Sequence, residues 1–335
     1  MNIREKIEQR EHEILSPYAS FSDQSKGREV EIPQCDIRPV YQRDRDRIIH
    51  CKAFRRLKQK TQVFLAPQGD HYRTRLTHTL EVSQNARTIA KALRLNEDLT
   101  EAIALGHDIG HTPYGHCGER ALNKFCPGGF EHNRQGVRLV EILEKNGEGL
   151  NLTYEVRDGI LNHQTSGDPA TLEGKIVRIS DKIAYINSDI DDAVRAHIIK
   201  NEDIPQKYTD VLGNTLNERL NTLIHDIISS SEGINDIKMT AEIEDAFKGL
   251  RKFMFENVYT NPIAKGEETK AAHVIDQLFE YYSNHIDELP DEFRMLIDKG
   301  TDRARAICDY IACMSDQYAT NMFKELTIPK TWNIL

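Results

Sequence analysis

Apolar side chains recur along much of the chain at the three- and four-residue spacing of an α-helix. One stripe runs from Val82 to Leu93, where apolar positions at i, i+4, i+7, i+8 and i+11 share one helical face. Similar stripes occupy 179–190, 216–228 and 243–254. Alternation with a period of two, the pattern of a half-buried strand, is scarce. The pattern therefore predicts an all-α fold.

Glycine, proline and polar residues divide the chain into three expected segments. Residues 16–40 are loop-like, so we expect residues 1–40 to form an N-terminal arm with loops. The composition becomes polar at 201–213, which indicates a seam between a core at 41–200 and a C-terminal helical region at 201–335. We expect the core and the C-terminal region to belong to one compact unit.

Length and composition exclude several classes of protein. The chain has 335 residues, of which 39% are hydrophobic and 29% charged, as in an ordinary globular protein. Its first 15 residues are densely charged, unlike a signal peptide, and no apolar run approaches the roughly 18 residues of a membrane helix. Six cysteines without a C-x-x-C pair argue against a disulfide framework or a thiolate zinc site. We therefore expect a cytoplasmic protein with no membrane partner.

Histidines and carboxylates are densest in the segment 106–119, which reads GHDIGHTPYGHCGE. A helix is expected from about 98 to 109, and it would place His107 on the buried face with Ile103. Adjacent His107 and Asp108 near a helix end offer one nitrogen and one oxygen ligand to a divalent ion. A His-Asp pair alone is weak support for a metal, because a buried histidine often only satisfies a carbonyl group.

Two residues outside this segment strengthen the metal hypothesis. His78 lies four residues before Val82 and shares its apolar stripe, and Asp181 follows the entry of a predicted helix. The order His78, His107-Asp108, Asp181 resembles the ligand set of the HD phosphohydrolase superfamily. Members of that superfamily bind a divalent metal and hydrolyse phosphoesters.

The flanking segments make the resemblance more specific. The chain is similar to the deoxynucleoside triphosphate triphosphohydrolases (the dGTPase group), which split a dNTP into deoxynucleoside and tripolyphosphate. The similar segments are AFRRL at 53–57, KTQVF at 60–64, RLTHTLEV at 75–82, HDIGHTPYGH at 107–116 and FEHN at 130–133. The resemblance is strong over 41–195, moderate over the first 40 residues and weak beyond about 200.

The resemblance implies a helical HD-domain fold with an additional C-terminal helical region, and hydrolysis of dGTP or of several dNTPs. It also implies a homo-oligomer, either a hexamer or a tetramer. One metal ion per subunit would be held by His78, His107, Asp108 and Asp181. Mixed nitrogen and carboxylate ligands suit Mn²⁺, Fe²⁺, Co²⁺ or Zn²⁺ better than Mg²⁺, which we expect with the nucleotide phosphates.

A proton donor is needed because cleavage beside the 5′ oxygen releases a poor alkoxide leaving group. His116 and Glu119, three residues apart on a short predicted helix, match the catalytic histidine–carboxylate pair of the family. His132 is a second candidate near the scissile group. The alternative is that His116 and Glu119 form a capping pair on a surface turn.

Six further residues match substrate-binding positions of the family. Tyr185 and Asp189 correspond to the pair that packs on the deoxyribose and receives its 3′-hydroxyl, and a tyrosine there would clash with a ribose 2′-hydroxyl. Gln62 corresponds to a glutamine that contacts the sugar. The matches near the phosphates are Arg75, His111 and Lys182. The alternatives are solvated surface charges and, for Tyr185, an ordinary half-buried helix residue.

The net charge of −9 is unfavourable for a protein that binds duplex nucleic acid, yet residues 43–60 carry eight basic side chains. One interpretation is a regulatory site at a subunit interface for an allosteric dNTP or single-stranded DNA. The other is a helix whose basic residues pair with Asp44 and Asp46, with Arg55 or Arg56 near the active site. We favour the second interpretation.

Two alternative functions stay open at this point. Another HD phosphohydrolase, acting on a nucleoside monophosphate, an alarmone or a cyclic dinucleotide, would use the same ligands, although the complete segment 107–119 speaks against it. A dNTP- or single-strand-binding module with lost catalysis would keep its binding after removal of His116. The C-terminal half carries no matching motif, and we expect it to supply contacts to the base and between subunits.

Overall fold

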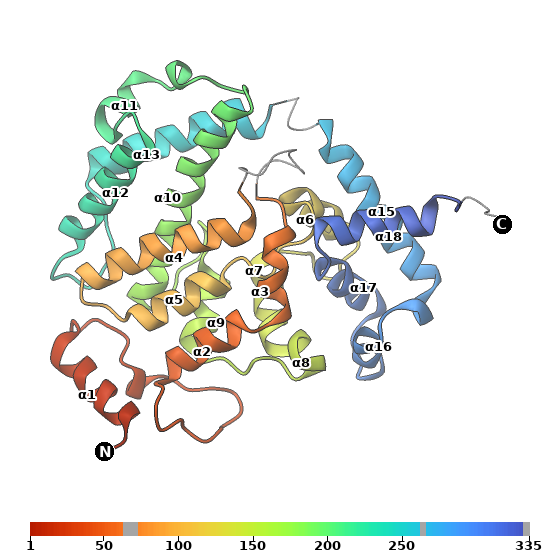
Figure 1. Cartoon of the computed structure of the whole chain (residues 1–335), viewed down its shortest axis with the longest axis horizontal. Helices are drawn as coiled ribbons and strands as arrows, with labels where there is room; N and C mark the ends of the chain where they lie inside the picture. Colours follow the sequence, from red (N-terminus) through yellow and green to blue (C-terminus); the bar gives the residue numbers. More distant parts are fainter. Residues whose placement is uncertain (63–72, 262–265, 331–335) are drawn as a thin grey trace, which may run out of the picture.

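A computed structural model describes residues 1–62, 73–261 and 266–330 of the chain (Figure 1). Helices make up most of these residues, and the described part contains no strand beyond an isolated antiparallel bridge between Thr61 and Thr74. The all-α prediction is therefore confirmed. Val63 and Phe64, which belong to one of the family-like segments, lie outside the described residues.

The N-terminal arm comprises α1 (Ile3–Ile14), the short helix η1 (Ser22–Gln24) and the loop that follows. Buried carboxylates attach it to the rest of the molecule. Glu173 accepts hydrogen bonds from the backbone and hydroxyl of Ser20, each at 3.0 Å, and Glu155 accepts from Ser25 and from the Lys26 amide. The arm therefore packs on the core instead of extending away from it.

The core contains the helices that carry the candidate ligands. These are α2 (Val40–Ile49), α3 (Lys52–Arg56), η2 (Leu57–Gln59), α4 (Arg75–Ala92), α5 (Glu97–Gly106), α6 (Gly115–Asn123), α7 (His132–Arg138), η3 (Leu139–Leu143), α8 (Glu144–Gly147), α9 (Tyr154–Asn162) and α10 (Leu172–Arg195). Helix α4 packs against both α5 and α10, and α9 packs against α5 and α10. The apolar stripe predicted on α4 is buried, because Val82, Ala86 and Ile89 have no exposed surface. This packing brings the beginning of α4 beside the middle of α10.

The C-terminal helices lie on two sides of the core (Figure 1). One group packs on α4 and α10 and consists of η4 (Asn201–Asp203), α11 (Gln206–Leu212), α12 (Leu216–Ser231), α13 (Ala241–Met254) and η5 (Phe255–Tyr259). The other group packs on α6 through α15 and consists of α15 (Glu268–Asn284), η6 (Ile286–Glu288), α16 (Asp291–Asp298), α17 (Arg303–Ala312) and α18 (Asp316–Thr327). The polar segment at 201–213 contains α11, which packs on α13 and buries Leu212.

The basic stretch at 43–60 is held mostly by contacts within the chain. Arg45 contacts Asp46, Asp98 and Glu101, whereas Asp44 pairs with Arg28, which lies outside the stretch. The expectation for Arg55 and Arg56 is wrong, because neither lines the main cavity; Arg56 lines a separate cavity beside α16 and α18. No described helix has the length and apolarity needed to span a lipid bilayer.

Candidate metal centre and active site

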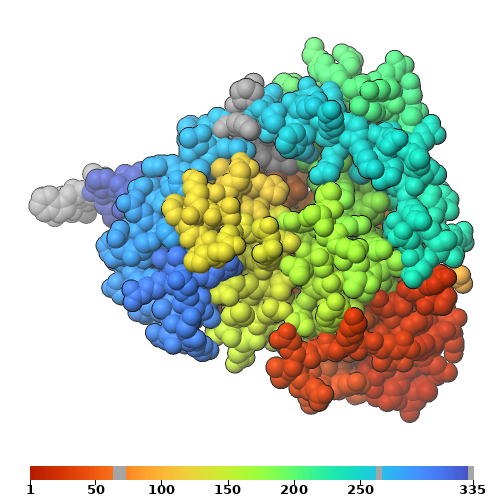
Figure 2. All heavy atoms as spheres, turned by 180° about the vertical axis from the view of Figure 1, so that it is seen from behind, coloured from red at the N-terminus to blue at the C-terminus, as the bar shows by residue number. Residues whose placement is uncertain are grey.

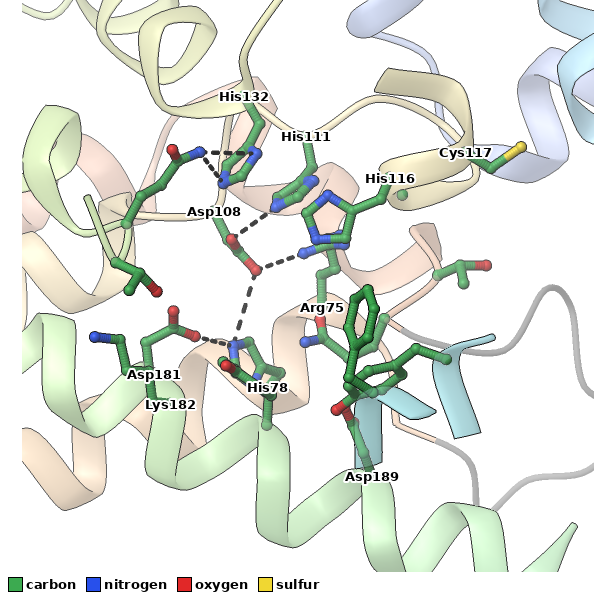
Figure 3. A pocket seen from close by; sticks show the side chains of 18 of the residues that line it. Arg75, His78, Asp108, His111, His116, Cys117, His132, Asp181, Lys182 and Asp189 are labelled. Carbon is green, nitrogen blue, oxygen red and sulfur yellow. Dashed lines mark hydrogen bonds and ion pairs between the residues drawn. The ribbon is translucent and has the colours of Figure 1, made fainter. Parts of the chain in front are cut away.

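The four predicted metal ligands converge at the junction of α4, α5 and α10. Figure 3 shows His78, Asp108 and Asp181 where they face the cavity. The Nε2 atom of His78 lies 3.1 Å from Oδ1 of Asp181 and 3.9 Å from Oδ2 of Asp108. The Nε2 atom of His107 lies 3.5 Å from Oδ1 of Asp108 and 3.8 Å from Oδ1 of Asp181. We refer to these four side chains as the predicted metal centre.

The hydrogen bonds around these side chains suit a bound cation. Nδ1 of His107 lies 2.7 Å from the carbonyl oxygen of Ala104 and donates to it, because a carbonyl can only accept. The lone pair of His107 is therefore on Nε2, which is buried and has no hydrogen-bond partner among the described residues. A buried imidazole nitrogen of this kind, facing two carboxylates, fits a divalent metal ion.

Hydrogen bonds and neighbouring basic groups keep the carboxyl group of Asp108 ionised. Arg75 donates to its Oδ2 at 2.7 Å, and Nε2 of His111 lies 3.0 Å from its Oδ1. Burial alone would raise the pKa of Asp108, but His107, Arg75 and His111 hold this pKa well below its usual value. The pKa of Asp181 is also lowered, because the hydrogen bond from His78 and nearby imidazoles outweigh burial. Metal binding requires such deprotonated carboxylates.

Glu119 on α6 is shared by two imidazoles. Its Oε2 accepts from Nδ1 of His116 at 2.9 Å, and its Oε1 accepts from Nδ1 of His132 at 3.0 Å. Burial raises the pKa of Glu119, but these hydrogen bonds and the charge of His132 lower it far below its usual value. The His116–Glu119 pair predicted from the sequence is thus joined by His132, the other predicted proton donor.

Glycine at position 110 permits the approach of His132. The predicted helix over 98–109 ends at Gly106, and residues 107–110 form a turn. A Cβ atom on Gly110 would lie 2.1 Å from the carbonyl oxygen of His132 and 2.2 Å from the amide nitrogen of Gly136. Any larger residue would therefore push the beginning of α7 away from the site.

His163 and Gln164, at the end of α9, were not predicted from the sequence. Nδ1 of His163 donates to the carbonyl of Ile160 at 2.7 Å, and its Nε2 lies 3.3 Å from Nε2 of His132. The side-chain nitrogen of Gln164 lies 3.2 Å from the same atom of His132. The only sequence signal was a histidine directly after an amphipathic segment.

A cavity of about 680 Å³ opens next to the predicted metal centre. Its walls come from α4, α6 and α10 of the core and from α13, η5 and α15 of the C-terminal region. In Figure 2 the segments of α6 (yellow), α10 (light green) and α13 (cyan) meet around this hollow. The predicted substrate residues all line it: Gln62, Arg75, His111, Lys182, Tyr185 and Asp189.

Five cavity residues beyond position 250 were not predicted, because their segment shows no motif in the sequence. They are Arg251, Phe255, Val258, Tyr259 and Glu268. The hydroxyl of Tyr259 donates to the carboxyl group of Asp189, and burial raises the pKa of Asp189 to about 7 despite this bond. Burial, together with the charges of Arg178 and Arg251, lowers the pKa of Lys182 to about 8.

Helix α18 supports the turn that begins α6. Tyr114 and Gly115 both have a positive φ, of 61° and 57°, and the ideal Cβ position of Gly115 is 3.1 Å from Nη2 of Arg75. Asp316 accepts from the Tyr114 amide and from the Thr61 amide, each at 2.9 Å. One residue of the C-terminal region therefore fixes two walls of the cavity.

Lys60 makes a second connection beneath the cavity. Its buried ammonium group donates to the carbonyl of His111 and, at 2.9 Å, to the carbonyl of Ala312. Burial lowers the pKa of Lys60 to about 7. The same side chain thereby holds the end of α17 and the residue that follows the 107–110 turn.

Comparison with known proteins places this geometry in a family. The HD domain matches residues 75–186, and the phosphohydrolase-associated domain matches residues 237–325. A deoxyguanosinetriphosphate triphosphohydrolase-like protein from Caldanaerobacter subterraneus subsp. tengcongensis is 57% identical over 332 residues, covering 99% of this chain and 98% of that protein. A protein of the same description from Clostridium perfringens is 51% identical, covering 98% of this chain and 99% of the relative.

The solved structures support the fold independently. A phosphohydrolase from Bacteroides thetaiotaomicron superposes with a TM-score of 0.54 at 14% identity, covering 95% of this chain and 74% of that one. At this identity the likeness concerns the fold alone. The end-to-end match with the sequence relatives goes further: the chain belongs to the HD-domain family of deoxyguanosinetriphosphate triphosphohydrolase-like proteins.

Proposed function

We propose that the protein hydrolyses deoxynucleoside triphosphates, dGTP or several dNTPs, to deoxynucleoside and tripolyphosphate. The observation that carries the proposal is one cavity that borders both the predicted metal centre and the two imidazoles that share Glu119. The first group suits a metal ion at a phosphoryl group, and the second suits proton donation to a leaving oxygen. The names of the relatives agree with this reaction.

His78, His107, Asp108 and Asp181 would hold the divalent metal ion in this proposal. The bound metal would polarise the α-phosphoryl group and supply an activated water molecule. The donor set favours Mn²⁺, Fe²⁺, Co²⁺ or Zn²⁺, with Mg²⁺ on the phosphates. Arg75 and His111, which bind Asp108 from the other side, keep that carboxylate oriented.

Proton transfer to the 5′ oxygen is assigned to the imidazoles on Glu119. Each donates through Nδ1 to a carboxylate oxygen, which fixes the orientation of the ring. His116 has a side chain that is 63% exposed and reaches the open part of the cavity, whereas His132 is buried. We propose His116 as the principal donor and His132 as the second histidine of the catalytic group.

The remaining cavity residues would bind the substrate. Arg75 and Lys182 supply positive charge for the triphosphate, and the pKa of about 8 keeps Lys182 mostly protonated at neutral pH. Tyr185 and Asp189 are one helical turn apart on α10 and would contact the deoxyribose. Gln62 has a buried carbonyl oxygen without a partner among the described residues, and a sugar hydroxyl would satisfy it.

The experiment is turnover of the four dNTPs, singly and mixed, with Mn²⁺ or Mg²⁺, and separation of the products by anion exchange. We expect deoxynucleoside and intact tripolyphosphate. Pyrophosphate or orthophosphate would identify a different HD phosphohydrolase, and absence of any product would favour a binding module. Turnover only in mixtures would reveal an activating dNTP site. Light scattering in the same buffers tests the homo-oligomer that the family resemblance implies.

A further inference from the structure

A second group of potential metal ligands lies beside the predicted metal centre. Its members are His111, His116, Glu119 and His132, which we call the imidazole cluster. Figure 3 shows its three imidazoles. Each side chain offers one ligand atom, and these four atoms lie within 4.8 Å of one another. We propose that the imidazole cluster is a second divalent-cation site that takes zinc. The site is additional to the metal of the proposed reaction.

Glu119 sets the spacing of this cluster. Its two oxygens lie 2.9 Å from Nδ1 of His116 and 3.0 Å from Nδ1 of His132. In a tetrahedral zinc complex neighbouring ligand atoms are about 3.3 Å apart, because each bond is about 2.0–2.1 Å long. The observed separations differ from this value by a few tenths of an ångström. Zinc can therefore replace the shared protons with small movements of the side chains.

His111 provides independent support for a bound cation. The residue is 2% exposed, and its Nε2 atom faces Asp108. Its Nδ1 atom is buried and has no hydrogen-bond partner among the described residues. A buried polar atom without a partner is destabilising, and a cation bound to Nδ1 would remove that cost. The ring stacks on His132 with 3.8 Å between centroids, so both rings border the same space.

Charge and access also favour a cation at this position. Glu119 is the one carboxylate among the four side chains, and it supplies the negative charge of the cluster. The side chain of His116 is 63% exposed at the cavity wall. An ion from solvent can therefore reach the cluster without any opening of the fold.

The two sites differ in the ions they should select. The predicted metal centre has two imidazoles and two carboxylates, whereas the imidazole cluster has three imidazoles and one carboxylate. Nitrogen-rich sites prefer Zn²⁺ over Mn²⁺ and Mg²⁺, following the usual order of divalent affinities. If the proposed function holds, zinc in the cluster also removes the proton donors and inhibits turnover.

Metal counting tests the site without reference to turnover. Protein loaded with Mn²⁺ is titrated with zinc chloride, desalted, and analysed for both metals by mass spectrometry. We expect a total of two ions per chain, with zinc as the additional ion. A total of one ion, with zinc replacing manganese, would overturn the proposal. Turnover is measured on the manganese-loaded protein before zinc is added. A protein that splits no dNTP at that stage, yet takes up the second ion afterwards, would refute the proposed function and leave this site intact.

Two variants locate the second ion. His116→Ala and Glu119→Gln should lower zinc affinity at least about tenfold, a loss typical even of outer-shell partners of metal ligands, while manganese stays bound. The exposed position of His116 makes its substitution harmless to folding. The matched control is His12→Ala, since His12 is an exposed histidine 2.9 Å from the Asp23 carboxylate and should leave the zinc affinity unchanged. Unchanged zinc affinity in His116→Ala, or equal loss in His12→Ala, would exclude the imidazole cluster.

Discussion

The carboxylate of Asp316 accepts a hydrogen bond from the backbone amide of Tyr114, although 202 positions separate the two residues. The same carboxylate accepts from the amide and hydroxyl of Thr61. The turn before α6 and the segment before Gln62 therefore have a common anchor on α18. Both segments line the cavity, so the C-terminal region shapes the site from a helix that lies far along the chain.

Replacement of Asp316 should test this anchor. Asp316→Ala leaves two backbone amides without acceptors, and we expect a loss of about 1–3 kcal/mol in the free energy of unfolding. Turnover should fall as well, because the cavity walls lose their support. The control is Asp291→Ala, which removes an exposed acidic residue from the same first-turn position of α16. Urea unfolding of both variants measures the two losses in the free energy of unfolding. Equal losses would show that Asp316 stabilises only its own helix.

Asp108→Ala should remove the metal and abolish turnover, because the buried cluster loses a carboxylate ligand. Metal content by mass spectrometry and product formation are measured on the same sample. Glu131→Ala, which changes an exposed carboxylate near His132, should alter neither quantity. Loss of the metal with turnover intact would refute the metal mechanism.

His116→Ala should keep the metal of the predicted metal centre and bind nucleotide, yet lose roughly a hundredfold to ten-thousandfold in kcat, the usual contribution of a general acid. The reason is that the 5′ oxygen leaves without a proton. Steady-state kinetics at saturating dNTP and a nucleotide-binding titration separate the two effects. His12→Ala serves as control, and kcat near the wild-type value would remove His116 from the mechanism.

Tyr185→Ala should relax discrimination against ribonucleotides. Without the ring, a 2′-hydroxyl no longer meets a steric barrier, and the ratio of kcat/KM for dGTP over GTP should fall roughly tenfold to a hundredfold. Tyr185→Phe keeps the ring and should keep the ratio. If the alanine variant rejects GTP as strongly as the wild type, the deoxyribose preference has another origin.

Burial of Lys60 should make stability depend on pH. Its pKa is about 7 in the folded protein and 10.5 in the unfolded chain, so between these values the unfolded state binds more protons. The free energy of unfolding should therefore gain a contribution that increases as pH rises from about 7 to 10.5. Lys60→Met should remove this contribution, whereas Lys58→Met, at an exposed position, should retain it. Urea titrations at several pH values give the slopes, and equal slopes in both variants would contradict the assignment.

Periodicity predicted the helices that carry long apolar stripes. The stripes beginning at Val82, Ile179 and Leu216 lie on α4, α10 and α12, because each helix buries one face against the core. The predicted helix extends three residues beyond the end of α5, because the spacing of apolar residues does not indicate the close approach of Gly110 to α7. The presence of a helix can be predicted from the local spacing of apolar residues, whereas the positions of its ends depend on tertiary packing.

The candidate site was predictable where its residues lie in the motifs between 62 and 189. The order of histidines and aspartates predicted which side chains belong to the metal centre, and the fold brings these side chains together. The sharing of Glu119 by His132 was not predictable, because it depends on how α7 enters the site. Arg251 and Tyr259 reach the cavity, and Asp316 anchors two of its walls, through tertiary packing of a region that shows no motif in the sequence.

The hydrogen bonds of Lys60 to the carbonyls of His111 and Ala312 bear on how such a chain can evolve. A fragment that ends near position 200 would retain every predicted metal ligand, yet it would lose the Ala312 carbonyl that Lys60 binds and the part of the cavity wall supplied by α13, η5 and α15. Truncation of the chain, or exchange of its C-terminal region alone, should therefore be tolerated poorly. We expect evolution to keep the two regions together, in keeping with relatives that align with the chain over nearly its whole length.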